Sequence, residues 1–188
     1  MKHAYVMISL TGTLLSRLVK LYTKEPYSHA SLSLDKELHR MYSFGRVIAW
    51  NPFWAAHMHE IPCENVFKRF NKTEMMLLEF DLTDEQYEKL EEFVETFWAQ
   101  RDNFHYSFLA LFFAMFNFYP RLKNELYCSQ YVGLALKYAG VNYWNKSYLA
   151  MRPRDFRTCP YCRVVYEGSL REYWNANCID EEHGFVKY

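Results

Sequence analysis

The sequence lacks an excess of either charge. Its 188 residues include 22 Lys and Arg and 22 Asp and Glu, so the formal net charge at pH 7 is zero. Proteins that attract nucleic acid or acidic lipid through a general electrostatic field carry a basic excess. Net charge therefore supports neither partner, and we expect no nucleic acid to bind. The length fits a single domain over residues 1–188.

The sequence also lacks a long hydrophobic run. The longest, FLALFFAMFNFY at residues 108–119, is shorter than the roughly 20 residues that a membrane-spanning helix needs. The first residues do not resemble a secretory signal, because Arg17, Lys20 and Lys24 interrupt the apolar stretch after Lys2 and no small-residue cleavage site follows. We therefore expect a cytoplasmic protein with no transmembrane segment.

The sequence also lacks the even number of cysteines that a disulfide framework would use. The chain has five, which are Cys63, Cys128, Cys159, Cys162 and Cys178. In a reducing compartment such cysteines are thiols by default. We expect free thiols that are available for packing or for chemistry.

The pair Cys159 and Cys162 has the CxxC spacing of half a zinc site. A closed structural zinc site needs four ligands, and no second CxxC or spaced His pair follows. His57 and His59 complete such a site only if the fold brings them to the cysteines. We expect neither a metal nor a redox role, but a buried pair of thiols beside the last strand.

Aromatic residues are abundant, with 16 Tyr, 15 Phe and 5 Trp. Apolar residues repeating every second position predict strands, and a period of 3.6 predicts helices. The expected strands cover 4–10, 28–35, 38–44, 47–50, 57–61, 75–81 and 163–168, and the expected helices cover 14–22, 84–98, 105–117 and 128–140. Early strands followed by late helices predict an α+β fold with an antiparallel sheet.

Cys128 lies in the first turn of an expected helix, because the apolar residues at helical spacing begin just after it. The first turn has unpaired N–H groups and the positive end of the helix dipole, which stabilise an anion such as a thiolate. Cys128 is therefore a candidate nucleophile, although a lone cysteine is more often a small buried hydrophobic side chain.

His29 is the candidate base. In SHASLSLD at residues 28–35, apolar and polar residues alternate, which places His29 on the polar face of a strand. A cysteine nucleophile needs an imidazole that takes its proton and later protonates the leaving group. A strand histidine is more commonly a surface or hydrogen-bonded side chain, so the catalytic role depends on its meeting Cys128 in space.

Two residues are alternatives for orienting His29. If residues 35–37 form a three-residue hairpin loop, His29 faces Ser43 on the next strand, whereas a four-residue loop places Phe44 there. Glu60, in HMHEI, is the other candidate, because a carboxylate holds an imidazolium better than a hydroxyl does. These residues alone leave the choice open.

Three segments resemble a known family: YSHASLSLD at 27–35, MYSFGR at 41–46 and ELYCSQYVGLALKYAGV at 125–141. They resemble the circularly permuted branch of the NlpC-type cysteine hydrolases, which are the YiiX/YebB-like relatives of lecithin:retinol acyltransferase. In that branch the His strand precedes the Cys helix, as it does here. The resemblance runs from about residue 4 to residue 156, where MRPRDF resembles the family's Pro-x-Asp segment.

The resemblance implies a circularly permuted papain-like fold, in which a small antiparallel sheet packs against the nucleophile helix. It also implies Cys128 as the nucleophile and His29 as the base. The third family residue, on the strand after the His strand, is often Glu, Asn, Gln or His. Ser43 at this position is a departure from that pattern.

Together these features predict a cysteine hydrolase that forms an acyl-enzyme and needs no cofactor. We expect backbone N–H groups at the start of the Cys helix to bind the oxyanion, and Tyr127, Ser129 and Tyr27 to be oxyanion- or substrate-binding residues. The resemblance implies that the substrate contains amide bonds of cell-wall-type peptides. The alternatives are an acyltransferase, thioesterase or lipase-like activity on a lipid acyl group, and a binding module without catalysis.

The apolar run at 108–119 bears on these alternatives. Such a run is most often a core helix covered on both sides, and this is what we expect here. Otherwise the run lines a pocket for an acyl chain or makes peripheral contact with a lipid surface.

Overall fold

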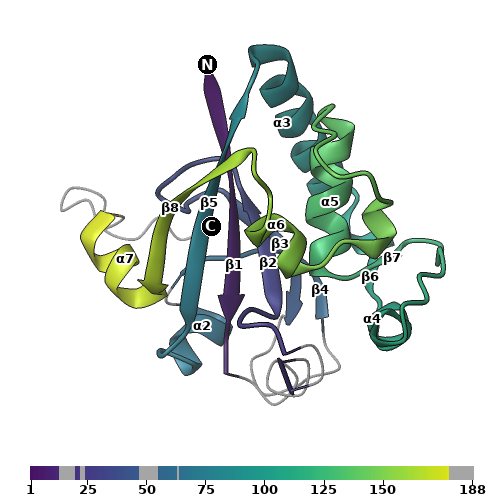
Figure 1. Ribbon diagram of the computed structural model, residues 1–188, viewed down its shortest axis with the longest axis horizontal. Helices are drawn as coiled ribbons and strands as arrows, with labels where there is room; N and C mark the ends of the chain where they lie inside the picture. Colours follow the sequence, from purple (N-terminus) through teal and green to yellow (C-terminus); the bar gives the residue numbers. More distant parts are fainter. Residues whose placement is uncertain (13–19, 22–23, 47–54, 63, 178–188) are drawn as a thin grey trace.

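The computed structural model describes residues 1–12, 20–21, 24–46, 55–62 and 64–177. Its main feature is a six-stranded sheet in the order β4-β3-β2-β1-β5-β8 (Figure 1). The strands are β1 Lys2–Leu10, β2 His29–Ser33, β3 Met41–Arg46, β4 Ala55–His59, β5 Glu74–Leu82 and β8 Cys162–Ser169. All neighbouring strands in this sheet are antiparallel, which confirms the α+β class and the antiparallel sheet.

The helices lie on both faces and at one end of this sheet. They are α2 Asn65–Arg69, α3 Asp84–Ala99, α4 Phe108–Met115, α5 Cys128–Tyr138, α6 Pro153–Arg157 and α7 Leu170–Asn177, with 3-10 turns η1 Arg101–Asn103 and η2 Tyr148–Ala150. Two short parallel strands, β6 His105–Tyr106 and β7 Glu125–Leu126, form a separate sheet. Within the described residues, every helix is too short or too polar to cross a bilayer.

The large sheet separates two hydrophobic cores. On β1, Val6 and Ile8 point into the core beneath α3 and α5, whereas Tyr5 and Met7 point into the core beneath α2 and α7. Because β1 is buried on both faces, its sequence is a continuous apolar run rather than an alternating one. The first core holds α5 against the sheet, and this packing positions the start of α5 at the edge of β2.

Several expected elements are confirmed and others lie outside the described residues. The capping box is present, with the Gln86 N–H donating to Thr83 Oγ1 at 3.1 Å and the Thr83 N–H donating to Gln86 Oε1 at 3.0 Å. The expected strand at 47–50 and most of the expected helix at 14–22 lie outside the described residues. Helix α7 was not expected from the hydrophobic pattern.

The hairpin between β2 and β3 has a longer loop than the three residues that we considered. Leu32 pairs with Tyr42, and the Leu34 N–H donates to the Arg40 carbonyl at 3.1 Å, so the loop covers residues 35–39. The Asp35 carboxylate stabilises this loop, because its two oxygens accept hydrogen bonds from the backbone N–H groups of His39 and Arg40 at 2.7 Å each. A local side-chain acceptor thus closes a five-residue loop.

This register corrects the expected position of Ser43. Continuing the observed pairing places Ser31, and not His29, opposite Ser43. The shift amounts to two residues, so each side chain keeps the face that the alternating pattern predicted. Ser43 therefore lies diagonally from His29 on the same face.

Helix α4 differs from the expected core helix. Ala110 and Ala114 pack in a buried cluster with Tyr127 and Cys128. In contrast, Phe112 on the opposite side is 53% exposed. The expectation that this helix is covered on both sides is therefore wrong.

Candidate active site

Cys128 is the first residue of α5 and is buried, with 5% of its surface exposed. The turn before it is held by Gln130, whose Oε1 accepts the Tyr127 N–H at 3.2 Å and whose Nε2 donates to the Leu149 carbonyl at 3.0 Å. The amide of Gln130 thereby joins the helix start to η2. The N–H groups of the first turn have no partners within the helix, and these are donors for an anion.

The structure brings His29 to Cys128. Helix α5 packs against β2, and the two side chains lie close enough for each to shift the pKa of the other. The backbone of Ala30, the next residue on β2, also lowers the pKa of the thiol. Two segments about 100 residues apart in the sequence therefore form one buried pair.

Glu60 is the main partner on the other side of the imidazole. His29 Nε2 lies 3.0 Å from Glu60 Oε1, and the Ser31 hydroxyl donates to the second carboxylate oxygen. Ser43 Oγ lies farther from the same nitrogen, at 3.4 Å. Of the two candidate orienting residues, Glu60 thus makes the shorter and charged contact, and Ser43 makes a peripheral one.

Glu60 is held in place by the backbone. It follows directly after β4, and its N–H donates to the Met41 carbonyl at 2.8 Å. Gly45 lies beside its carboxylate, where a Cβ atom would be 2.9 Å from Glu60 Oε1. The missing side chain at Gly45 therefore provides the space that the carboxylate occupies.

The three side chains favour an ionised state. Burial lowers the pKa of His29, but the carboxylate of Glu60 and the sulfur of Cys128 outweigh it and raise that pKa to about 10. Burial raises the pKa of Cys128, but attraction to His29 and its hydrogen bond outweigh it, so the thiol pKa lies below its usual value. The pKa of Glu60 is lowered by His29 in spite of burial. Each of the three side chains therefore favours the charged form of its neighbour.

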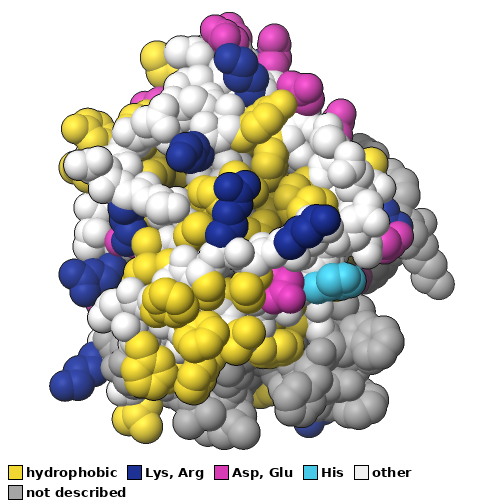
Figure 2. Space-filling model, turned by 90° about the vertical axis from the view of Figure 1, so that its right-hand side faces the viewer, with side chains coloured by type: hydrophobic (Ala, Val, Ile, Leu, Met, Phe, Trp, Pro, Cys, Tyr) yellow, Lys and Arg dark blue, Asp and Glu magenta, His cyan; other side chains and the backbone are white. Residues whose placement is uncertain are grey.

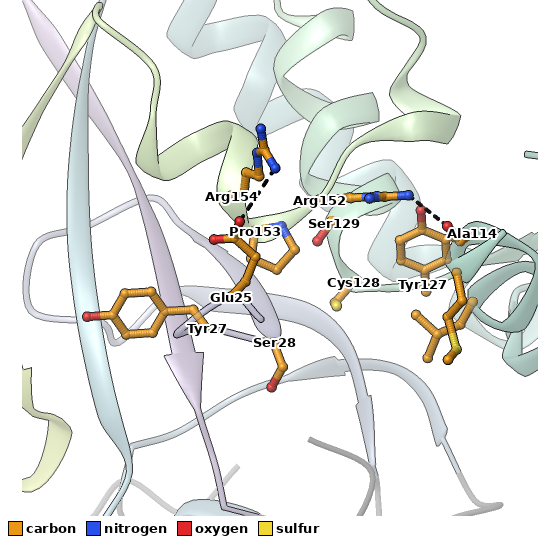
Figure 3. Close-up of a pocket in the computed structure, with 12 residues that line it drawn as sticks. Glu25, Tyr27, Ser28, Ala114, Tyr127, Cys128, Ser129, Arg152, Pro153 and Arg154 are labelled. Carbon is orange, nitrogen blue, oxygen red and sulfur yellow. Dashed lines mark hydrogen bonds and ion pairs between the residues drawn. The ribbon is translucent and has the colours of Figure 1, made fainter. Parts of the chain in front are cut away.

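A cleft opens at Cys128 (Figure 3) and holds about 700 Å³ of empty space when its open mouth is included. Apolar residues of α4 form one wall, and the start of α6 and the segment before β2 form the other. The lining residues are Glu25, Tyr27, Ser28, Leu111, Ala114, Met115, Tyr127, Cys128, Ser129, Arg152, Pro153 and Arg154. The sulfur thus faces a space that a small substrate can enter.

The expected oxyanion- and substrate-binding residues all line this cleft, but in different ways. The Tyr127 hydroxyl donates to the carbonyls of Leu149 and Met151 at 3.2 and 3.3 Å, so it is not free for an oxyanion. The Tyr27 hydroxyl donates to Glu167 Oε1 at 2.9 Å, and its ring points away from the sulfur (Figure 3).

Ser129 is the remaining member of that set. Its hydroxyl is buried beside the Cys128 sulfur and has no nitrogen or oxygen partner within the described residues. The backbone N–H groups at the start of α5 and this hydroxyl are therefore hydrogen-bond donors beside the Cys128 sulfur.

Sequence reasoning missed the charged residues of the cleft. The Arg152 guanidinium donates to the Ala114 carbonyl, Asn117 Oδ1 and the Tyr119 hydroxyl at 2.7, 2.9 and 2.6 Å, and so joins α4 to the start of α6. Glu25 forms ion pairs with Arg154 and Arg157 at 3.6 and 2.9 Å. The signal in the sequence was the MRPRDF segment, which was noted for its Pro-x-Asp pattern and not for its arginines.

The cysteine pair near β8 does not form a metal site with the histidines that we considered. Cys162 Sγ donates to the Cys159 carbonyl at 3.4 Å, and burial raises the pKa of Cys162 to about 12. His57 instead packs among aromatic rings, and His59 Nε2 contacts the His39 carbonyl at 2.6 Å.

Another cluster has ligand atoms close enough together for a metal ion. Within the described residues, His3, Glu79 and Asp81 form the only group of this kind. Arg163 already pairs with both of these carboxylates, so a protein cation balances their charge.

No protein-family model, curated protein or solved structure significantly matches this chain. The resemblance to permuted NlpC-type hydrolases therefore stays a prediction. The cleft ends at Cys128, and behind it lie the two titratable side chains of His29 and Glu60.

Proposed function

We propose that this protein is a cysteine hydrolase with a circularly permuted papain-like fold, in which Cys128 is the nucleophile, His29 the general base and acid, and Glu60 the orienting residue. The observation that carries the proposal is the series of Cys128, His29 and Glu60, in which His29 contacts Glu60 at 3.0 Å and the thiol and the imidazole shift each other's pKa. It lies at a cleft, and each member shifts the pKa of its neighbour toward the charged form. Perturbed titratable groups of this kind gather at active sites.

The proposed reaction begins when the Cys128 thiolate attacks a carbonyl carbon. A C–S bond forms, and the C=O electron pair moves to the oxygen, which accepts N–H groups at the start of α5. Collapse of this intermediate breaks the bond to the leaving group, which takes the proton of the His29 imidazolium. Water then attacks the thioester while His29 takes its proton, and the acid leaves as the thiolate is restored.

For the substrate, we propose amide bonds in small peptides of the cell-wall type, as the family resemblance implies. Charged groups at the cleft support a small polar ligand, because Glu25 and Arg154 line its wall. A lipid acyl group is the second candidate. It is supported by Leu111, Ala114 and Met115 of α4, which make the opposite wall apolar.

Intact-mass spectrometry after rapid acid quenching tests the reaction and distinguishes the substrates. A γ-glutamyl peptide and a phospholipid would each leave an acyl group of its own mass on Cys128. We expect one of these adducts on the wild-type protein and on the Cys162→Ser variant, whose change lies outside the cleft. The Cys128→Ala variant should carry no adduct and show no turnover.

The third candidate, a binding module without catalysis, makes the opposite prediction. It requires that the wild-type protein forms no adduct with either substrate and that ligand binding is the same in the Cys128→Ala variant. This result would refute the hydrolase proposal.

A further inference from the structure

The outer face of α4 is an exposed ridge of large apolar side chains. Leu109, Phe112 and Phe116 are 52%, 53% and 62% exposed, and Phe118, just after the helix, is 58% exposed. Among the ring contacts of the described residues, Phe112 packs on Phe113 and Phe116, and Phe118 packs on Phe113. The rings of the ridge therefore contact one another rather than another element.

Such a ridge is unusual for a surface helix. A surface helix normally turns charged or polar side chains to water, whereas α4 has the sequence FLALFFAM and is apolar on all sides. Figure 2 shows hydrophobic side chains gathered on the face that carries α4. An exposed apolar patch of this kind marks an interaction site.

The segment that carries the ridge is positively charged, although the net charge of the chain is zero. Residues 103–124, which contain α4 and the segment that follows it, include Arg121 and Lys123 but neither Asp nor Glu. Both cations are exposed. In Figure 2, Lys and Arg side chains lie above the hydrophobic side chains, and acidic and His side chains lie beside them. Apolar side chains beside Lys and Arg are the combination that binds the interface of an anionic membrane.

The size of the ridge argues against a second copy of the chain as the occupant. Each of the four side chains leaves about 100 Å² exposed, so the ridge offers roughly 400 Å². A stable protein–protein interface takes about 800 Å² from each partner. A membrane needs no such minimum, because the binding strength grows with the apolar area inserted and the number of cations near the surface.

We infer that the outer face of α4 docks the protein on an anionic phospholipid membrane. The ridge of Leu109, Phe112, Phe116 and Phe118 inserts into the interface, while Arg121 and Lys123 contact the lipid head groups. The inner side of the same helix lines the cleft at Cys128, so docking brings the cleft close to the membrane surface. This inference does not depend on the reaction of Cys128.

Vesicle flotation of the full chain tests this inference, with phosphatidylcholine vesicles compared with mixed phosphatidylcholine and phosphatidylserine vesicles. We expect binding to the mixed vesicles that falls roughly tenfold or more in Phe112→Ser/Phe116→Ser. In Arg121→Gln/Lys123→Gln, it should fall by roughly fivefold for each cation removed, and the preference for phosphatidylserine should disappear. The Cys128→Ala protein should bind as the wild type does.

The matched control carries the same kind of change elsewhere on the surface. Tyr161, just before β8, and Val164, within it, are 62% and 55% exposed. Strand β8 is at the edge of the sheet that lies farther from α4 (Figure 1). Tyr161→Ser/Val164→Ser should bind vesicles as the wild type does. Circular dichroism of each variant verifies that the fold is kept.

Three results would overturn the inference. The first is that the wild-type protein fails to float with either vesicle, and the second is that the Phe112→Ser/Phe116→Ser variant floats as well as the wild type. The third is that light scattering shows a wild-type dimer which this double variant converts to a monomer, because the ridge would then bind a second copy.

Discussion

His29 Nε2 lies 3.0 Å from Glu60 Oε1, and the two side chains are only 15% and 7% exposed. Their mutual attraction acts in a dry environment, where a charge pair is screened less than in water. This contact links the sulfur of Cys128 to the far end of β4 through one imidazole. It makes the ionisation of the cysteine depend on a carboxylate that does not line the cleft.

The first prediction concerns the reactivity of Cys128. Because His29 lowers the thiol pKa, alkylation of Cys128 by iodoacetamide should persist well below pH of about 8.5, the usual pKa of a free thiol. In His29→Ala the attraction to the imidazolium is lost and the thiol pKa rises, so the rate at pH 6.5 should fall by roughly 10- to 100-fold. Peptide mapping after alkylation reports on Cys128 alone. Equal rates in the two proteins would show that His29 does not activate the sulfur.

The second prediction separates Glu60 from Ser43. As the pH rises through the His29 pKa of about 10, the imidazolium loses its proton. We expect kcat/KM to fall over this pH range, which is the basic limb of its pH profile. In Glu60→Gln the pKa of His29 falls, so the basic limb should move to lower pH and kcat/KM should drop roughly 100-fold. Ser43→Ala removes a 3.4 Å contact and should cost about fivefold. A larger loss in Ser43→Ala than in Glu60→Gln would assign the orienting role to Ser43.

The third prediction uses the space at Gly45. In Gly45→Ala the new Cβ lies 2.9 Å from Glu60 Oε1, so the carboxylate must move away from His29. We expect kcat/KM to fall about tenfold, with the basic limb at lower pH. Gly140→Ala is the control, because Gly140 has a φ of +82° with no atom within 4 Å of the added Cβ. It should cost about 1 kcal/mol of stability without moving the pH profile. An unchanged pH profile in Gly45→Ala would contradict the prediction.

The fourth prediction concerns His57, which is 4% exposed and whose two ring nitrogens have no partner within the described residues. Burial lowers its pKa to about 4, so the folded protein keeps it neutral where the unfolded chain binds a proton. The free energy of unfolding should therefore decrease by about 3 kcal/mol as the pH drops from about 6.5 to about 4.

The His57→Phe variant tests this dependence, because Phe fits an aromatic site and has no proton to bind. Urea unfolding at pH 7.5, 5 and 4 should show a smaller acid loss in His57→Phe than in the wild type. His105→Phe changes an exposed histidine and should keep the full acid loss. The same acid loss in the wild type and in His57→Phe would exclude His57 as its source.

Features that depend on local sequence were predictable. The start of α5 at Cys128 follows from a helical pattern that begins there, and the cap of α3 follows from Thr83 and Gln86, which lie three residues apart. The face of His29 follows from strict alternation along β2. Each of these depends on residues within one or two turns of the chain.

Features that depend on distant residues were less predictable. The register of β2 and β3 depends on the length of a loop that Asp35 closes through its side chain. The choice of Glu60 over Ser43 depends on the path of the chain between β3 and β4. For α4, composition shows that every side is apolar, but not which sides the rest of the fold covers. Hydrophobicity alone therefore predicted burial where Phe112 and Phe116 are exposed.

The short parallel pair of β6 and β7 joins the starts of the two helices beside the cleft, α4 and α5. Strand β6 ends one residue before Ser107, the cap of α4, and β7 ends one residue before Tyr127, the cap of α5. The Ser107 N–H donates to the Leu126 carbonyl at 3.0 Å, and its hydroxyl donates to Glu125 at 2.7 Å. Helix α4 cannot swing outward like a lid without breaking the bonds that also hold the start of α5. In the proposed reaction, this shared anchor limits how far the gap beside the sulfur can widen, and so limits the size of the acyl group that fits it.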